Sequence, residues 1–399
     1  MSNYNNNNNT LAASLKLKTG QIFHGTSFGA PVNSFGEAVF TTSLVGYPES
    51  MTDPSYTGQI LVFTQPLIGN YGVPGQDKDE FGLYKYFESD GIQVQGIIVN
   101  DYATEYSHWT AVESLSEWCV RHNVPAISGV DTRALTQLLR DQGSTLAQIC
   151  VGDEASLDNI SALQFPNPND ENLVAKVSTK VPVTYNPKGE IKIAVIDCGV
   201  KQNILRCLAS RGASVTVLPY NYDFNAVADQ FDGVFVSNGP GSPVACIETI
   251  KNLKVAIDHL KKPIFGICMG NLLLGMAAGL QVYKLPFGNR GHNQPALNVD
   301  TGLCYITSQN HGYALNDTCM PKSWKRLFVN ANDGSNEGIQ HETKPIFSVQ
   351  FHPEAKGGPQ DTVYLFEEFL KHVRAQKVEN EGFHASISDI QTSAVAAFA

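Results

Sequence analysis

A cysteine between two glycines constrains the fold of this chain more than any other feature of its sequence. Residues 264–267 form an apolar run typical of a buried strand, and residues 272–278 form a run typical of a packed helix. Between them, Cys268 has Gly266 and Gly270 two positions away on either side. Such glycines permit a sharp strand-to-helix turn, the nucleophile elbow, which exposes the side chain and frees backbone N–H groups for an oxyanion. The helix N-terminus favours thiolate over thiol.

A lone cysteine in an apolar run is more often an inert core residue. The flanking glycines favour a nucleophile instead, and so do His352 and Glu354, which follow later in the chain. A cysteine nucleophile needs a base, and the base needs a group that orients it. The run Phe347-Ser-Val-Gln-Phe-His352-Pro-Glu354 supplies both, because a strand delivers His352 to its end and Pro353 turns the chain. Glu354 can then fix the tautomer of the imidazole.

The composition excludes several classes of function. The chain has 399 residues with 42% hydrophobic and 17% charged content, which suggests two or three domains. A net charge of -10 argues against binding to nucleic acid or to an anionic membrane surface, and no apolar stretch is long enough to cross a membrane. The eight cysteines have no C-x-x-C spacing, which is typical of a reduced intracellular protein without a disulfide framework or a zinc site.

The character of the sequence divides the chain into five parts. Residues 1–13 are asparagine-rich and resemble neither a secretory signal nor a mitochondrial presequence, so we expect a disordered tail. Residues 14–152 predict a mixed α and β domain, and residues 153–190 an interdomain segment. Over residues 191–374, strands alternate with helices, which predicts a parallel α/β sheet. Residues 375–399 are polar and small and predict a linker or tail, as in a chain cut from a longer polypeptide.

Local patterns place several elements in the first domain. Residues 15–25 read as two strands joined in a hairpin. Residues 109–122 and 132–142 have helical spacing, and Asp131 precedes the second of these helices as its N-cap.

Two polar segments are further candidates for the site. The loop Asn238-Gly-Pro-Gly241 follows a strand and precedes a helix, but it lacks the Lys-Ser/Thr of a phosphate-binding P-loop. Its N–H groups could serve a developing oxyanion, and a purely structural turn is the equal alternative. Residues 308–313 form a polar patch that could approach an amide or an amino acid. His311 in this patch has no carboxylate within a few residues, so we expect His352 to be the base.

These segments together resemble class I glutamine amidotransferases, in the order Asn238-Gly-Pro-Gly, Gly266-Ile-Cys-Met-Gly and Phe351-His-Pro-Glu. The first domain narrows the resemblance to the glutaminase (small) subunit or domain of carbamoyl-phosphate synthetase, and the resemblance covers about residues 14–374. It implies an α/β protein, in which a mixed α+β N-terminal domain precedes an amidotransferase domain with a mainly parallel central sheet. The motifs are Gly36-Glu-Ala-Val-Phe, Gly46-Tyr-Pro-Glu, Thr52-Asp-Pro-Ser-Tyr56, Ile68-Gly-Asn, Gly129-Val-Asp-Thr-Arg133, Asp197-Cys-Gly-Val-Lys, Gly288-Asn-Arg-Gly-His-Asn-Gln-Pro and Ser308-Gln-Asn-His-Gly-Tyr.

The resemblance also implies a mechanism. Cys268 attacks the side-chain amide of L-glutamine, while the N–H groups of Gly239 and Met269 hold the oxyanion. His352, oriented by Glu354, protonates the departing ammonia, and water then hydrolyses the γ-glutamyl thioester to glutamate. By resemblance, the positions that contact glutamine are Ser55, Gly239, Gly241, Met269, Leu272, Asn310, Gly312 and Tyr313.

In this family, ammonia travels through an internal tunnel to a large synthetase that makes carbamoyl phosphate from bicarbonate. The implied partner is therefore that synthetase, as a separate large subunit or a fused domain, and it is the component that uses ATP and Mg. For this chain we expect no cofactor and no metal of its own. The missing presequence and the linker-like C-terminus favour a cytoplasmic, multifunctional enzyme of pyrimidine biosynthesis over an arginine- or urea-type role.

One position departs from the family pattern. The pair after Cys-x-Gly is usually His-Gln, and that glutamine contacts the substrate, whereas this chain has Asn271-Leu272. Ammonia-dependent synthetases of the urea cycle also carry Asn-Leu, but they have lost the cysteine. Because Cys268, His352 and Glu354 are all present, we expect an active glutaminase. The alternative is a non-catalytic regulatory subunit, which the Asn-Leu pair favours. A cysteine peptidase or another hydrolase would leave the first domain without an explanation.

Overall fold

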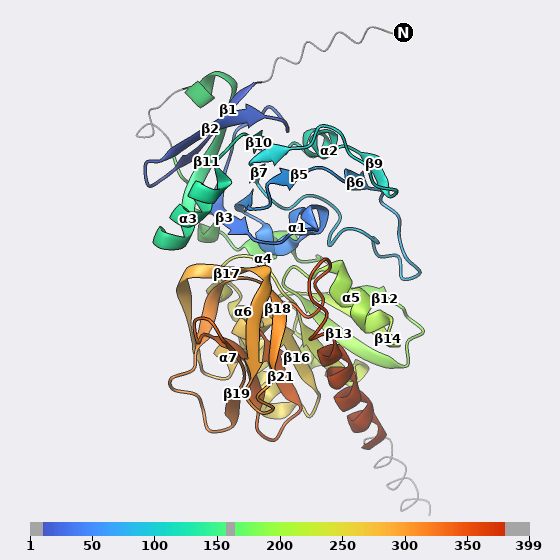
Figure 1. Ribbon diagram of the computed structural model, residues 1–399. Coiled ribbons are helices and arrows are strands. Elements are labelled where there is room, and N and C mark those ends of the chain that lie inside the picture. The colour runs from blue at the N-terminus through green and yellow to red at the C-terminus, as the bar shows by residue number, and fades with distance from the viewer. Residues whose placement is uncertain (1–10, 157–163, 380–399) are drawn as a thin grey trace, which may run out of the picture.

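The computed structural model describes residues 11–156 and 164–379, and Figure 1 shows two domains packed one above the other. The N-terminal domain is built on a closed barrel and the C-terminal domain on a ten-stranded sheet. The expected tail over residues 1–13 lies almost wholly outside the described residues, and β1 (Ala12–Leu17) already begins at Ala12. The C-terminal tail was expected from residue 375, but a helix over residues 364–379 continues into it.

The barrel has the strand order β1-β11-β3-β4-β7-β10-β2. Its strands are β1 (Ala12–Leu17), β2 (Ile22–Ser27), β3 (Ser34–Thr41), β4 (Gln59–Phe63), β7 (Gly96–Ile98), β10 (Ala126–Ser128) and β11 (Thr145–Val151). The predicted hairpin is present, since β1 and β2 pair antiparallel. Pairs β3–β4, β4–β7 and β7–β10 are parallel. The apolar side chains of alternating strand positions, such as Leu15, Ile60 and Ile149, are fully buried together.

One of the two predicted helices of this domain is correct and the other is half wrong. Helix α3 (Thr132–Gln142) begins as expected, with the Asp131 side chain accepting a hydrogen bond from the Ala134 N–H at 2.9 Å. In the segment predicted as a helix over residues 109–122, the first half is β9 (Ala111–Glu113), which pairs with β6 (Val73–Pro74). Helix α2 (Leu115–Arg121) starts only after Ser114, which forms a capping box with Glu117. The cap, rather than the apolar spacing, sets the boundary.

In the second domain, the expected parallel strands form the centre of the ten-stranded sheet. Its strands are β12 (Val183–Tyr185), β13 (Ile191–Asp197), β14 (Ala213–Pro219), β15 (Gly233–Val236), β16 (Ile264–Ile267), β17 (Gln281–Asn298), β18 (Cys304–Asn316), β19 (Trp324–Asn330), β20 (Asn336–His341) and β21 (Ile346–Val349). The central strands β14-β13-β15-β16-β21 are all parallel. They read as nearly continuous apolar runs because helices cover both faces. Strands β20, β19, β17 and β18 extend one edge in antiparallel fashion.

Helices cover both faces of the parallel strands, and an apolar layer fills the space between the strands and the helices on each face. Helices α6 (Ile247–His259) and α7 (Met269–Ala277) pack on one face, in a cluster with β15 and β16 residues such as Val236 and Ile264. On the other face lie α5 (Gln202–Ala209) and the helix over residues 364–379. There, Phe235 stacks on Phe366 with ring centroids 6.0 Å apart. Among the described residues, no helix is both long and apolar enough to cross a membrane.

The segment between the domains contributes to the second of them. Residues 153–190 were expected to form a connection, yet β12 in this segment pairs antiparallel with β14 at the edge of the sheet. Its other described elements include the short helix α4 (Leu173–Val177). The barrel domain lies over the carboxyl ends of the parallel strands, where the 3₁₀ turn Pro54–Tyr56 contacts the loop after β15. Loops at that edge of a parallel sheet are the usual place for a ligand site.

Candidate active site

The predicted elbow is present at the junction of β16 and α7. Cys268 is the N-cap of α7 and has φ 55° and ψ -101°, which places a non-glycine residue in the positive-φ region. Both flanking glycines are needed for close packing: a Cβ on Gly270 would lie 2.2 Å from the Val236 oxygen, and one on Gly266 would lie 2.7 Å from the Gly270 oxygen. This packing holds Cys268 in its strained backbone conformation, with its side chain at the edge of the sheet.

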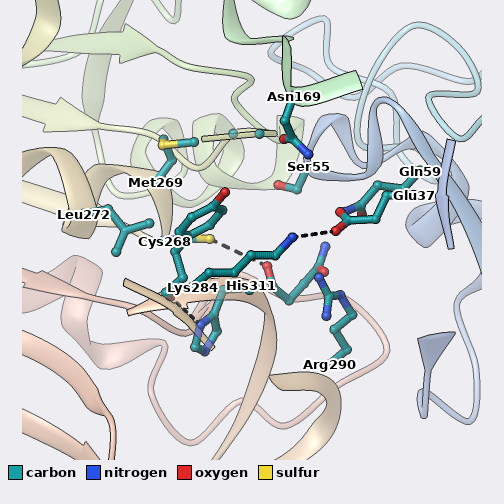
Figure 2. A pocket seen from close by; sticks show the side chains of 15 residues that line it. Glu37, Ser55, Gln59, Asn169, Cys268, Met269, Leu272, Lys284, Arg290 and His311 are labelled. Carbon is teal, nitrogen blue, oxygen red and sulfur yellow. Dashed lines mark hydrogen bonds and ion pairs between the residues drawn. The ribbon is translucent and has the colours of Figure 1, made fainter. Parts of the chain in front are cut away.

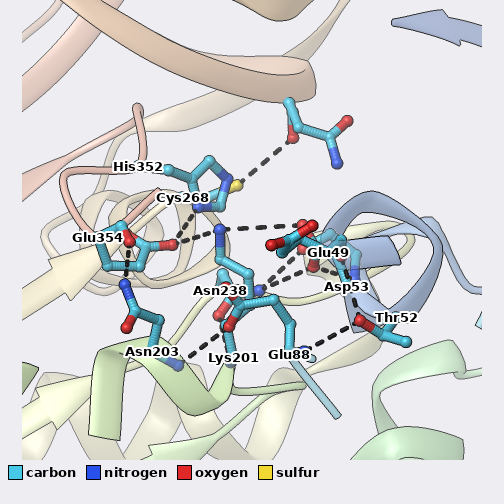
Figure 3. A network of polar contacts seen from close by, with 12 residues as sticks. Glu49, Thr52, Asp53, Glu88, Lys201, Asn203, Asn238, Cys268, His352 and Glu354 are labelled. Atoms are coloured by element: carbon cyan, nitrogen blue, oxygen red, sulfur yellow. Dashed lines mark hydrogen bonds and ion pairs between the residues drawn. The ribbon is translucent and has the colours of Figure 1, made fainter. Parts of the chain in front are cut away.

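The structure brings His352 and Glu354 to this cysteine. His352 follows the end of β21, and its N–H donates to the Ser308 oxygen at 2.8 Å. Its Nδ1 lies 2.8 Å from Oε1 of Glu354, and its buried Nε2 has no hydrogen-bond partner among the described residues. Figure 3 shows the imidazole directly beside the sulfur of Cys268, whose Sγ contacts the Asn310 oxygen at 3.8 Å. The arrangement has the form of a nucleophile, a base and an orienting carboxylate.

A buried lysine that the sequence analysis did not single out completes this network. Nζ of Lys201 lies 2.6 Å from Oε1 of Glu354 and 4.0 Å from Oδ2 of Asp53, which belongs to the barrel domain (Figure 3). A second contact runs in parallel, from Asn238 Nδ2 to Ser55 Oγ at 2.9 Å. Lys201 and Asp53 both lie in the motifs that carry the resemblance, which was the only signal that could have marked them.

The charges in this network shift the pKa values of His352 and Glu354. Burial raises the pKa of Glu354, but Lys201 and His352 lower it more, so that its pKa falls to about 2. Burial and Lys201 lower the pKa of His352, but Glu354 and Cys268 raise it to about 10. Burial also disfavours the charge of Lys201, yet the carboxylates around it, with Glu354 the largest contributor, hold its pKa above the ordinary range. The site therefore holds Glu354 ionised and favours a proton on His352.

All eight positions expected to contact glutamine line one cavity together with Cys268 (Figure 2). The cavity lies between the domains, because Ser55 comes from the barrel and the others from the amidotransferase-like domain. Six further residues line it that were not predicted as site residues: Glu37, Gln59, Asn169, Lys284, Arg290 and His311.

The Asn271-Leu272 pair is split between two environments. Asn271 is fully buried, where its Nδ2 donates to Gln350 Oε1 at 2.8 Å and its Oδ1 accepts from Ser348 Oγ at 2.8 Å. These bonds tie α7 to the end of β21. Leu272 lines the cavity while also packing into the apolar layer beneath α7. Only Leu272 thus faces the site where the family carries an amide.

Two N–H groups are available to an oxyanion near the cysteine. Those of Gly239 and Met269 donate no backbone hydrogen bond within the described parts of the chain. Met269 is the first residue of α7, where a helix leaves its N–H groups without internal acceptors. Gly239 lies so close to Cys198 that a Cβ would be 2.0 Å from the Cys198 oxygen. This packing holds its N–H at the cavity wall.

His311 has a carboxylate neighbour that its own segment did not reveal. Its Nε2 lies 3.5 Å from Oε1 of Glu337 on β20 and 3.2 Å from Oε1 of Gln309, and its Nδ1 lies 2.9 Å from the Tyr313 oxygen. The sequence segment around His311 has no carboxylate, as stated above, and this partner comes instead from β20, which is distant in the sequence. With both ring nitrogens occupied, His311 holds the Asn310 segment in place, and only His352 presents a free nitrogen to Cys268.

The described residues contain no group of three or more His, Cys, Asp or Glu that could hold a metal ion. All eight cysteines, each within the described ranges, are free thiols.

Comparison with known proteins gives two family matches. Residues 15–149 match the carbamoyl-phosphate synthase small chain, CPSase domain, and residues 194–372 match the class-I glutamine amidotransferases. The carbamoyl phosphate synthase arginine-specific small chain of Chaetomium globosum is 62% identical over 366 residues, which are 92% of this chain and 79% of that one. The proteins of the same name from Neurospora crassa and Aspergillus oryzae are each 59% identical, over 92% and 93% of this chain and 81% and 82% of theirs.

The ion pairs around Glu354 predict a specific dependence of stability on pH. Its folded pKa of about 2 lies below the ordinary 4.5, so its contribution to the free energy of unfolding is complete above pH 4.5 and disappears as the pH falls to 2. Denaturant unfolding of the wild type and of Glu354→Gln should therefore give a difference that shrinks over this range. A difference that stays constant from pH 4.5 to 2 would contradict the ion pairing.

Proposed function

Because the chain belongs to the family of carbamoyl-phosphate synthase small chains, we propose that it hydrolyses L-glutamine and supplies ammonia for carbamoyl phosphate synthesis. The observation that carries this proposal is the position of Cys268, with the His352–Glu354 pair beside it, in the wall of the cavity that all eight expected glutamine contacts line. The partner is a synthetase that uses ATP and Mg, as a large subunit or a fused domain.

The first half of the reaction follows from the geometry of the elbow. Sγ of Cys268 attacks the side-chain amide carbon of glutamine, and the negative oxygen that forms is stabilised by the N–H groups of Gly239 and Met269. His352, which favours the protonated form, gives the proton of its Nε2 to the leaving nitrogen. The carbon–nitrogen bond breaks, ammonia departs, and a γ-glutamyl thioester remains on the cysteine.

In the second half, the neutral imidazole acts as the base. Nε2 of His352 takes a proton from a water molecule, whose oxygen attacks the thioester carbon. The same N–H groups stabilise the second oxyanion. Its collapse breaks the carbon–sulfur bond, releases glutamate and restores the Cys268 thiolate beside a protonated His352. Glu354 and Lys201 keep the imidazole in one orientation through both steps.

A second cavity supports the expected passage of ammonia. It is lined by His352 and by residues of both domains, among them Asp53, Glu88, Lys201 and Asn310. Asn310 also lines the glutamine cavity, so the two cavities share a wall at the site where ammonia forms. We propose that ammonia leaves through this second cavity toward the synthetase, without first entering bulk water.

The comparisons do not support the expected pyrimidine role. The relatives from Chaetomium globosum, Neurospora crassa and Aspergillus oryzae carry the name arginine-specific small chain. We therefore propose an arginine-type pathway, with a cytoplasmic location kept as a prediction for cell fractionation. Source cells that lack this chain should need arginine in the medium, whereas a need for pyrimidine alone would contradict the assignment.

The non-catalytic alternative rests on the Asn271-Leu272 pair. Against it, the buried network beside Cys268 holds His352, Glu354 and Lys201 in contact, with Lys201 and Glu354 ionised. Burying these charges costs free energy of folding, and a subunit that served only as a scaffold would gain nothing from them.

Replacing the nucleophile separates the two readings. In the complex of this chain with its synthetase, Cys268→Ser should abolish glutamine-dependent carbamoyl phosphate synthesis and retain synthesis from added ammonia, because only the thioester step is lost. Cys304→Ser, at an exposed thiol, serves as the matched control and should keep both activities. Glutamine hydrolysis that survives Cys268→Ser would reject the mechanism.

The side chain at position 272 predicts the strength of glutamine binding. Leu272→Gln should lower the KM for glutamine about tenfold to a hundredfold with little change in kcat, since one hydrogen bond to a charged group contributes about 1.5–3 kcal/mol. The contact is equal in ground and transition states, so the effect falls on KM. Because Leu272 also packs under α7, the melting temperature is measured on the same variant. An unchanged KM with a lowered melting temperature would mean that the side chain is only structural.

A further inference from the structure

An arginine in the glutamine cavity has no direct hydrogen-bond or ion-pair partner among the described residues. Arg290 lies on β17 and lines the same cavity as Cys268, and only 7% of its surface is exposed. Within the described residues it donates no hydrogen bond, and its Nε is fully buried without a partner. A buried, unpaired guanidinium is costly, so a native protein that keeps one implies a ligand for it.

Glycines shape the place where this guanidinium lies. A Cβ on Gly288 would be 2.0 Å from Nη1 of Arg290, and one on Gly312 would be 3.4 Å from Nη2. Gly312 also lines the cavity, so the planar group lies against the cavity wall. Figure 2 shows the guanidinium turned toward the middle of the cavity.

The nearest carboxylate does not neutralise this arginine. Glu37 is the acidic residue that lines the cavity, and it accepts hydrogen bonds from Ser144 Oγ at 2.6 Å, Lys284 Nζ at 2.9 Å and Gln59 Nε2 at 3.0 Å. Glu37 forms its ion pair with Lys284, and no ion pair of Arg290 occurs among the described residues. Glu37 attracts the charge of Arg290 without a direct contact, and with Arg290 and Lys284 against Glu37 the cavity keeps one excess positive charge.

Free glutamine brings one matching negative charge, its α-carboxylate, to this cavity. A guanidinium presents paired N–H donors in the plane that a carboxylate accepts. Leu272, where the family carries an amide, offers the polar end of the substrate nothing. We propose that Arg290 binds the α-carboxylate of glutamine and so selects a free amino acid over a side-chain amide within a peptide. This inference rests on the proposed glutaminase function.

The test compares two substrates that differ only at the α-carboxylate. L-Glutamine and its neutral α-amide, L-glutaminamide, are given to the complex of the chain with its synthetase, and the deamidated product is measured. Arg290→Gln should raise the KM for glutamine about tenfold to a hundredfold, leave its kcat within about twofold, and leave the KM for the α-amide unchanged. Arg290→Lys should recover part of the loss, because it restores the charge without the fork. Arg140→Gln, at an exposed arginine of α3, is the matched control.

Two outcomes would overturn the proposal. An equal loss for both substrates would mean that Arg290 acts on the cysteine or on the oxyanion, and an unchanged KM for glutamine would mean that it does not bind substrate. Melting of the chain alone separates a structural role. Without ligand, Arg290→Gln should melt no lower than wild type, because it removes an unpaired charge, whereas a lowered melting temperature would also reject the proposal.

Glutamine binding can be measured in Cys268→Ser, which cannot form the thioester, so the role of Arg290 is tested independently of glutamine hydrolysis. Calorimetry with glutamine should show binding to Cys268→Ser and at least tenfold weaker binding when Arg290→Gln is added. If the wild-type complex hydrolyses no glutamine, the proposed function fails, while calorimetry still decides the role of Arg290.

Discussion

The site depends on one buried ion pair, the contact of Lys201 with Glu354. It fixes the carboxylate that orients His352, and through Asp53 it also reaches the barrel domain. Burial alone would drive each of these groups toward its neutral form. Lys201 and His352 keep Glu354 ionised, and Glu354 is the largest of the carboxylate contributions that keep Lys201 charged. Asp53 of the barrel domain thus contributes to the charge balance of a triad whose three residues all belong to the amidotransferase-like domain.

A second constraint is the close approach of backbone segments around the nucleophile. At Gly266 and Gly270, the backbones of β16, α7 and β15 approach so closely that no side chain would fit between them. Gly239 permits an equally close approach to the backbone of Cys198. The positive φ of Cys268 is sustained by this packing. Glycines thus place the thiol and the two N–H groups on one side of the cavity, while β17 and the barrel supply the charged residues on the other.

The sequence predicted those parts of the site that depend on short, local sequence patterns. The elbow at Cys268, the strand that delivers His352 and the parallel sheet each follow from short apolar runs and glycines, and the structure contains them. Three features escaped because they depend on contacts between distant segments: the Lys201–Glu354 pair, the Glu337 carboxylate beside His311, and the unpaired Arg290. The helix expected over residues 109–122 failed for a related reason, since pairing of β9 with β6 and the Ser114 cap override its apolar spacing.

The central claim is that Cys268 carries the substrate as a thioester, and covalent trapping tests it most directly. The chain, in complex with its synthetase, is incubated with a diazo-ketone analogue of glutamine, and the modified peptide is identified by mass spectrometry. The account predicts a single adduct on Cys268 that excess glutamine prevents from forming. An adduct on another cysteine, or continued glutamine hydrolysis by fully labelled protein, would contradict it.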